Sequence, residues 1–158
     1  MLNKLLNMLT LKAKASRTVE NDPLQKFMFR VTIPGLPSGV SFQKVGGLSR
    51  ETAVVEYLEG MYQYAHKLAG REKVSDITLE RGSYASEELM KEYKKVLTNP
   101  ARRSTIIIEI LDRFGNTRRT YKLAEAWVTK WEGSDLDATS DDVAIEKITV
   151  TFEYFIED

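Results

Sequence analysis

The side chains that most often carry catalysis or hold metal ions are scarce in this sequence. Its 158 residues include one histidine, His66, and no cysteine. A thiol nucleophile, a Cys-ligated zinc site, an iron–sulfur cluster and a disulfide are therefore excluded. A zinc site at His66 would have to be completed by carboxylates alone, and no Gly-x-Ser-x-Gly turn presents a serine to His66. The sequence predicts no catalytic residue, no cofactor and no enzymatic activity.

One run of oxygen-bearing side chains has the spacing of a calcium-binding loop. Positions one, three, five, seven and twelve of that loop would be Asp135, Asp137, Thr139, Asp141 and Glu146. Position six is Ser140, where the sharp turn requires glycine, and residues 148–156 have the pattern of a strand where an exiting helix is needed. We therefore expect a solvated acidic loop and no metal site.

Composition limits the class of protein. The sequence has 23 Lys and Arg against 23 Asp and Glu, and it is 42% hydrophobic and 9% aromatic. These values are typical of a globular chain and argue against disorder, while the absence of a basic excess argues against a generic nucleic-acid binder. No apolar run reaches the length of about 18 residues that a membrane span needs, so no stable membrane association is expected.

Residues 1–22 are predicted to form an N-terminal arm, and residues 23–158 a single β domain. In the arm, Leu2, Leu5, Leu6 and Leu9 recur at helical spacing and would make a short apolar stripe. Such a stripe needs a covering surface, for instance a neighbouring subunit. The alternative is a loose terminus.

The rest of the chain alternates in short β-type runs, with one helical segment. The helix is expected from about Ser86, as N-cap, to Leu97, ended by Asn99-Pro100. In a regular last strand, the apolar residues before Glu146-Lys147 and those after it would lie on opposite faces. A bulge with one extra residue near Glu146-Lys147 would bring both sets to the same face. This pattern predicts a mainly β fold, a sandwich or barrel with one flanking helix. About seven strands are expected, at residues 27–33, 50–58, 73–81, 105–111, 117–123, 126–132 and 142–156.

Two of these strands, 50–58 and 73–81, are polar on both faces and do not have the pattern of a deep core. The connection between them, residues 59–72, is long enough to reach beyond its own domain. We therefore expect this pair and its connection to make subunit contacts. The candidate interface residues are Glu56, Tyr57, Glu59, Gly60, Tyr62, Tyr64, His66 and Arg71.

Several short motifs follow one another between Phe27 and the end of the chain. They are Phe27-x-Phe29-x-Val31-x-Ile33-x-Gly35, Phe42-x-x-Val45-x-Gly47-Leu48-Ser49-x-Glu51, Glu56-Tyr57-x-Glu59-Gly60, Ile77-x-Leu79-x-Arg81-Gly82, Ala126-Trp127-x-x-Lys130-Trp131 and the stretch from Asp135-Leu136-Asp137-Ala138 to Ile145-Glu146. In this order and spacing, the motifs resemble the tail-tube protein family of contractile-tailed bacteriophages and related injection machines.

The resemblance implies a structural protein of the virion tail, assembled in the host cytoplasm. Its subunits would form hexameric rings that stack into a hollow tube inside a contractile sheath, and its hairpins would join a β-barrel around the channel. The implied partners are further copies of the chain, the sheath, a tape-measure protein, baseplate and tail-terminator proteins, and DNA in passage. A channel for DNA should not hold phosphates, so a neutral to acidic lining is expected. Candidate lining residues are Glu51, Glu56, Asp76 and Glu80.

Three alternatives remain open at the level of sequence. The same tube could belong to a headless device, such as an R-type bacteriocin or an extracellular or type VI injection system. More distantly, the chain could be a monomeric β-barrel that binds a small ligand in a dry cavity. The third alternative is an enzyme, and substitution of His66 without loss of function would argue against it.

Overall fold

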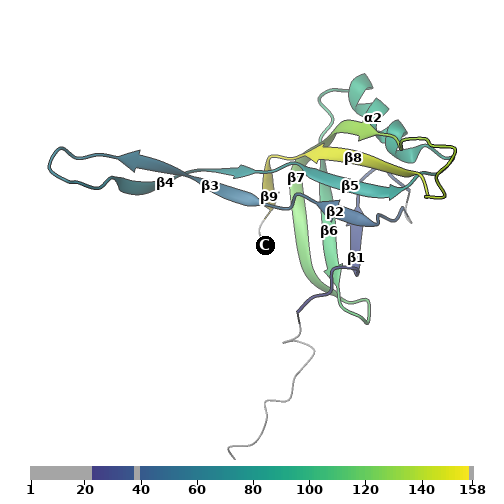
Figure 1. The fold of residues 1–158 in the computed structure, drawn as a ribbon, viewed down its shortest axis with the longest axis horizontal. Coiled ribbons are helices and arrows are strands. Elements are labelled where there is room, and N and C mark those ends of the chain that lie inside the picture. The colour runs from purple at the N-terminus through teal and green to yellow at the C-terminus, as the bar shows by residue number, and fades with distance from the viewer. Residues whose placement is uncertain (1–22, 38–39, 157–158) are drawn as a thin grey trace, which may run out of the picture.

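A computed structural model describes residues 23–37 and 40–156 of the chain (Figure 1). This part of the chain is mainly β, with nine strands and one helix, α2. Nine strands replace the predicted seven, and the helix is confirmed. The strands are β1 (Phe29–Thr32), β2 (Lys44–Gly46), β3 (Arg50–Tyr57), β4 (His66–Val74), β5 (Ile77–Gly82), β6 (Ser104–Leu111), β7 (Thr117–Glu132), β8 (Ile145–Thr151) and β9 (Tyr154–Ile156), and α2 spans Glu88–Thr98.

Seven of the strands form one antiparallel sheet in the order β1-β6-β7-β8-β5-β2, with β9 also paired to β7. The long strand β7 connects the two halves of this sheet, because its first part pairs with β6 and β9 and its second part pairs with β8. Between these parts Glu125 has a φ of 53°. A single left-handed residue bends the strand and lets the sheet fold over the core. The two strands predicted at 117–123 and 126–132 are thus one bent strand.

The core lies between the halves of the bent sheet and under α2. Its completely buried large side chains are Ile77, Leu79, Leu89, Ile106, Ile108, Leu123, Ile148 and Val150. They alternate along β5, β6 and β8, as expected for strands with one buried face. α2 packs against β7 and adds Leu89 to this core.

The helix differs from the prediction at its start and on its buried face. Glu87, not Ser86, is the N-cap, with a φ of 49° and no side-chain capping hydrogen bond. The end at Asn99 is confirmed. Leu97, the last residue of the predicted helix, is exposed, whereas Glu92 is buried and forms ion pairs of 2.8 Å with Lys95 and with Arg102. In the described part of the chain no helix has the length and hydrophobicity needed to cross a bilayer.

The bulge predicted near Glu146-Lys147 is wrong. The pairing of β8 with β5 runs without interruption from Ile145 to Val150. Glu146 points inward because its carboxylate accepts hydrogen bonds from Arg81 Nε at 2.9 Å and from Trp131 Nε1 at 3.2 Å. No extra residue is needed in this strand, because the charged residue Glu146 occupies an inward position that the sequence pattern reserved for an apolar residue.

The strand predicted at 73–81 is also wrong. Lys73 and Val74 end β4, whereas β5 is a central strand with every second side chain buried. The predicted connection 59–72 is therefore largely β4, which pairs with β3. Gly47, just before β3, has a φ of 87°, and a side chain there would collide with the carbonyl oxygen of Asp76.

Candidate assembly interface

Strands β3 and β4 form a hairpin that projects from the body (Figure 1). Within the described residues, these two strands pair only with each other. A two-stranded hairpin is at best marginally stable in water, because one pair of strands buries too little apolar surface. The hairpin therefore has the properties of an element that needs a partner surface.

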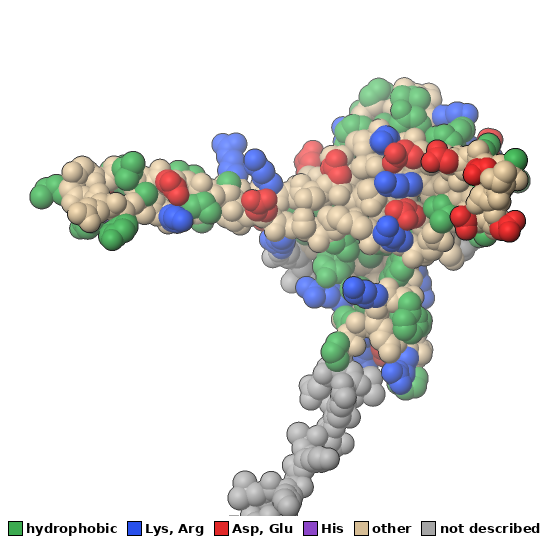
Figure 2. Space-filling view, in the orientation of Figure 1, with side chains coloured by type: hydrophobic (Ala, Val, Ile, Leu, Met, Phe, Trp, Pro, Cys, Tyr) green, Lys and Arg blue, Asp and Glu red, His purple; other side chains and the backbone are tan. Residues whose placement is uncertain are grey.

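Large apolar side chains are exposed along the hairpin and at its tip, where Figure 2 shows them as green patches. Met61 is 96% exposed and Tyr64 is 81% exposed. The full set of exposed large apolar side chains here is Val54, Val55, Tyr57, Leu58, Met61, Tyr62, Tyr64 and Leu68. Contiguous apolar surface of this kind marks a site of interaction with another molecule.

The cross-strand register separates the hairpin into two unlike faces. Residues directly opposite each other in an antiparallel pair lie on the same face. One face thus carries the opposed pairs Val55 with Leu68 and Tyr57 with His66. It is largely apolar towards the tip.

The other face of the hairpin carries cross-strand ion pairs. Glu56 lies opposite Lys67, with 4.0 Å between Oε1 and Nζ, and Arg50 Nε lies 2.6 Å from Glu72 Oε1. Val54 and Ala69 lie between these two pairs. This face is suited to water, and the apolar face is suited to protein.

A bulge in the hairpin depends on Gly70. The pairing shifts between Thr52 and Val54, where Gly70 and Arg71 together lie opposite Ala53. A Cβ atom on Gly70 would lie 2.9 Å from the Ala53 carbonyl oxygen, so backbone would have to move. Because the bulge changes which side chains of β4 share a face, Glu72 lies on the same face as Ala69 and Lys67.

The structure brings the eight described interface candidates together on this one hairpin. Glu56 and Tyr57 end β3; Glu59, Gly60, Tyr62 and Tyr64 lie in the turn; His66 and Arg71 belong to β4. The Tyr62 and His66 rings meet edge to face, with centroids 5.3 Å apart. The arm candidates Leu2, Leu5, Leu6 and Leu9 lie outside the described residues.

The four candidate lining residues lie on different elements. Glu51 and Glu56 occupy opposite faces of β3, because they are an odd number of residues apart. Asp76 precedes β5 and accepts a hydrogen bond of 2.8 Å from Thr151 Oγ1. Glu80 lies in β5, and its carboxylate accepts a hydrogen bond of 3.2 Å from Lys44 Nζ.

Sequence reasoning missed Val54, Val55, Met61 and Leu68 as exposed apolar residues of this interface. It treated residues 59–72 as a connection without structure, although such long connections are uncommon in compact domains. That length, together with the Tyr, Leu and Ala residues it contains, was the signal for a hairpin.

Three of the five oxygen-bearing side chains with calcium-loop spacing, those of Asp137, Thr139 and Glu146, form hydrogen bonds with other groups of the chain. Asp137 Oδ1 accepts hydrogen bonds from the Thr139 backbone N–H and hydroxyl, and these bonds lower the pKa of Asp137. Glu146, the twelfth position, is buried in β8 with Arg81. Among the residues that the structure describes, no group of three or more His, Cys, Asp or Glu side chains is placed to hold a metal ion.

Comparison with known proteins gives one family and several similar structures. The family model described as T4-like virus tail tube protein gp19 matches residues 25–156. A chain in the cryo-EM structure of an extracellular contractile injection system, the PVC sheath-tube complex in the extended state, is 25% identical, with a TM-score of 0.74 over 85% of this chain and 90% of that chain.

Two further structures share this fold. A chain in the PVC sheath/tube terminator structure is 25% identical, with a TM-score of 0.76 over 85% of this chain and 96% of that chain. A chain in the anti-feeding prophage cap structure is 22% identical, with a TM-score of 0.76 over 92% of this chain and 97% of that chain. No curated protein sequence matches the chain.

Proposed function

This chain belongs to the T4-like virus tail tube protein gp19 family, and from that premise we propose that it is the structural subunit of a phage tail tube. In this proposal six copies form a ring, and rings stack into a hollow channel inside a contractile sheath. DNA passes through the channel into the host. The subunit acts by assembly and carries out no chemistry.

The observation that carries the proposal is the projecting β3–β4 hairpin with its exposed apolar face. Strand edges without a partner tend to pair with another chain, and closing a barrel removes such edges. A ring built from head-to-tail contacts would give each hairpin a neighbour on either side. The apolar face with Val55 and Leu68 would meet protein, and the face with the ion pairs would meet water.

The proposed channel is neutral to acidic. A basic lining would hold DNA through many contacts that release counterions. Glu56 is balanced by Lys67 on the charged face of the hairpin, which supports a lining of low net charge. Asp76 and Glu80 are the other proposed lining residues. The remaining candidate, Glu51, shares the face of β3 that carries Val55, and the proposal turns that face towards protein. Changing inward carboxylates to lysine should slow genome delivery and leave tube assembly intact; normal delivery by several such variants would contradict this lining.

The proposed partners are the other components of such a tail. They are a sheath, a tape-measure protein inside the tube, and baseplate and terminator proteins, with the assembled tube in the virion tail and its assembly in the host cytoplasm. Support for the sheath and the terminator comes from the similar chains in the PVC sheath-tube and sheath/tube terminator structures.

A second candidate is the tube of a headless injection device. The observation that favours it is that both structures at 25% identity come from an extracellular contractile injection system. Particles purified from producing cells distinguish the two candidates. DNA-filled heads attached to tails containing this chain support the phage, and headless particles without packaged DNA support the device.

Self-assembly is tested by negative-stain electron microscopy and by solution mass at rising concentration. Val55 is 50% exposed and Leu68 is 56% exposed, so burying the remainder of both at a contact contributes about 2 kcal/mol. Changing both to serine should therefore raise the concentration needed for assembly by about 30-fold. The matched control is Leu97→Ser on α2, where the side chain is 63% exposed.

The outcomes separate the hypotheses. Rings or tubes from the unchanged chain, lost in the hairpin variant and kept in the control, support the tube. Equal assembly of the hairpin variant and the unchanged chain would remove the hairpin from the interface. An unchanged chain that stays monomeric at every concentration would contradict self-assembly and favour a monomeric ligand-binding barrel.

A further inference from the structure

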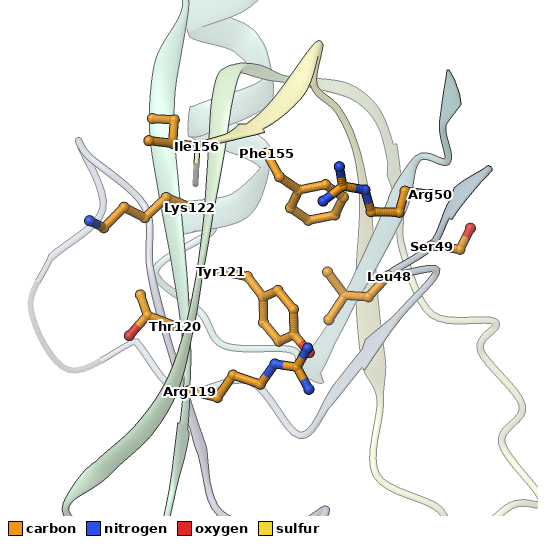
Figure 3. Close-up of a pocket in the computed structure, with 9 residues that line it drawn as sticks. All are labelled: Leu48, Ser49, Arg50, Arg119, Thr120, Tyr121, Lys122, Phe155 and Ile156. Atoms are coloured by element: carbon orange, nitrogen blue, oxygen red, sulfur yellow. The ribbon is translucent and has the colours of Figure 1, made fainter. Parts of the chain in front are cut away.

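A cleft of about 440 Å³ lies at the base of the hairpin, between the start of β3 and strands β7 and β9 (Figure 3). Its apolar lining includes Leu48, Tyr121, Phe155 and Ile156. In Figure 3 the side chains of Leu48, Tyr121 and Phe155 lie towards one another. The cleft therefore offers an apolar floor large enough for a side chain from another molecule.

Cationic side chains border this apolar floor. Arg50 and Arg119 lie on the same side as Tyr121 in Figure 3, whereas Lys122 lies on the other side of β7, and none of the described lining residues is acidic. Arg50 is paired with Glu72, whereas the Arg119 guanidinium lies over the Tyr121 ring at 5.0 Å. No carboxylate of a described residue forms an ion pair with Arg119. The cleft thus combines apolar surface with positive charge, and this combination suits a ligand that is apolar and acidic.

The chain itself presents a segment of that chemistry. The loop at residues 133–144 contains Asp135, Asp137, Asp141 and Asp142 and no Lys or Arg. Between the first two lies Leu136, which is 91% exposed. The hydrogen bonds from Thr139 to Asp137 fix the local conformation of the loop. An apolar side chain is therefore displayed between two carboxylates.

The loop and the cleft lie apart within one copy. The loop connects β7 to β8 at the end of the body away from the hairpin, and the cleft is at the hairpin's base (Figure 1). Figure 2 shows acidic side chains gathered at the loop end and basic side chains near the hairpin's base. Complementary surfaces at opposite ends of a subunit allow head-to-tail contacts, which can be repeated from copy to copy.

We propose that Asp135-Leu136-Asp137 of one copy docks into this cleft of a neighbouring copy. Leu136 packs against Leu48, Tyr121 and Phe155, and Asp135 pairs with Arg119. This contact deepens the proposed function, since it rests on self-assembly and names a second contact besides the hairpin. Burial of Leu136 supplies affinity, and the charges select the register between copies.

A charge exchange tests the contact in the full chain. Arg119→Glu and Asp135→Lys should each raise the concentration needed for assembly by about tenfold, because each places like charges together. A chain carrying both changes, or an equimolar mixture of the two single variants, should assemble nearly as the unchanged chain does. The control for Arg119→Glu is Lys91→Glu on the exposed face of α2, which makes the same change of charge and should have no effect.

The result that would overturn the contact is unchanged assembly of both single variants. Failure of the double variant and of the mixture, with thermal unfolding equal to that of the unchanged chain, would overturn it as well. In either case, tubes formed by the unchanged chain would still support the proposed function.

A cross-link tests the same contact without requiring tubes. The sequence has no cysteine, so a cysteine placed in each of two copies reports only their mutual contact. Leu48→Cys places the thiol on the cleft floor beside Tyr121 and Phe155 (Figure 3), and Leu136→Cys replaces the docking side chain. Under mild oxidation this pair should give a disulfide-linked dimer in several-fold excess over the control pair of Leu48→Cys with Lys91→Cys. Equal yields from both pairs would overturn the contact, whether or not tubes form.

Discussion

The ion pair of Arg81 with Glu146 is a buried charge whose removal has a predictable effect on stability. Both residues are 2% exposed, and Arg81 Nε lies 2.9 Å from Glu146 Oε1. Arg81 Nη1 also pairs with Glu88 at 2.9 Å, and so connects β5 to the start of α2. Removing one partner of a buried pair leaves the other charge uncompensated in a medium of low polarity.

Glu146→Gln keeps the shape of the side chain but removes the charge and one of the two acceptor oxygens. The amide can accept the hydrogen bond from Trp131 or the one from Arg81, but not both. Breaking a buried pair costs about 3–5 kcal/mol. We expect the lower end, about 3 kcal/mol, because Glu88 still compensates Arg81. For a chain of this size the midpoint of thermal unfolding should fall by about 6–12 °C.

Urea unfolding and thermal unfolding, followed by circular dichroism, measure this loss. The control Glu88→Gln removes a carboxylate whose side chain is 25% exposed, and it should cost about 1 kcal/mol or less. Replacing Arg81 and Glu146 together by methionine should recover most of the stability, because no buried charge is left and Arg81 Nη2 has no hydrogen-bond partner among the described residues. A loss below about 1 kcal/mol for Glu146→Gln would refute the reasoning.

Two further predictions concern the hairpin turns. The backbone N–H of Asn116, with further donors that include Arg118, lowers the pKa of Asp112 from 3.8 to about 2. The stabilisation by the Asp112 carboxylate is present above about pH 4 and is lost as the pH falls through 2, so Asp112→Asn should flatten the acid dependence of the unfolding midpoint in that range, and equal slopes would count against it. Gly70→Val should distort the bulge of the β3–β4 hairpin, because its Cβ would lie 2.9 Å from the Ala53 carbonyl oxygen; assembly should weaken while the unfolding midpoint of the body changes little, and assembly at the unchanged concentration would contradict this.

The sequence by itself determined the fold class and the position of most elements. Alternation of apolar residues located the strands around Ile106 and Ile148, since a strand with one buried face repeats every second residue. Asn99-Pro100 marked the end of the helix, because a proline cannot continue it. The order and spacing of short motifs indicated the family that the comparisons show.

The tertiary structure alone decided which strands pair and which charges are buried. Alternation tells which face of a strand is buried but not which distant strand lies beside it, so the pairing of β3 with β4 could not be derived from it. Glu146 and Arg81 come from strands 65 residues apart, and each can be buried only because the other is there. The left-handed Glu125, which joins two predicted strands into one, is stabilised by the ladders on both sides of it and by no signal of its own residue type.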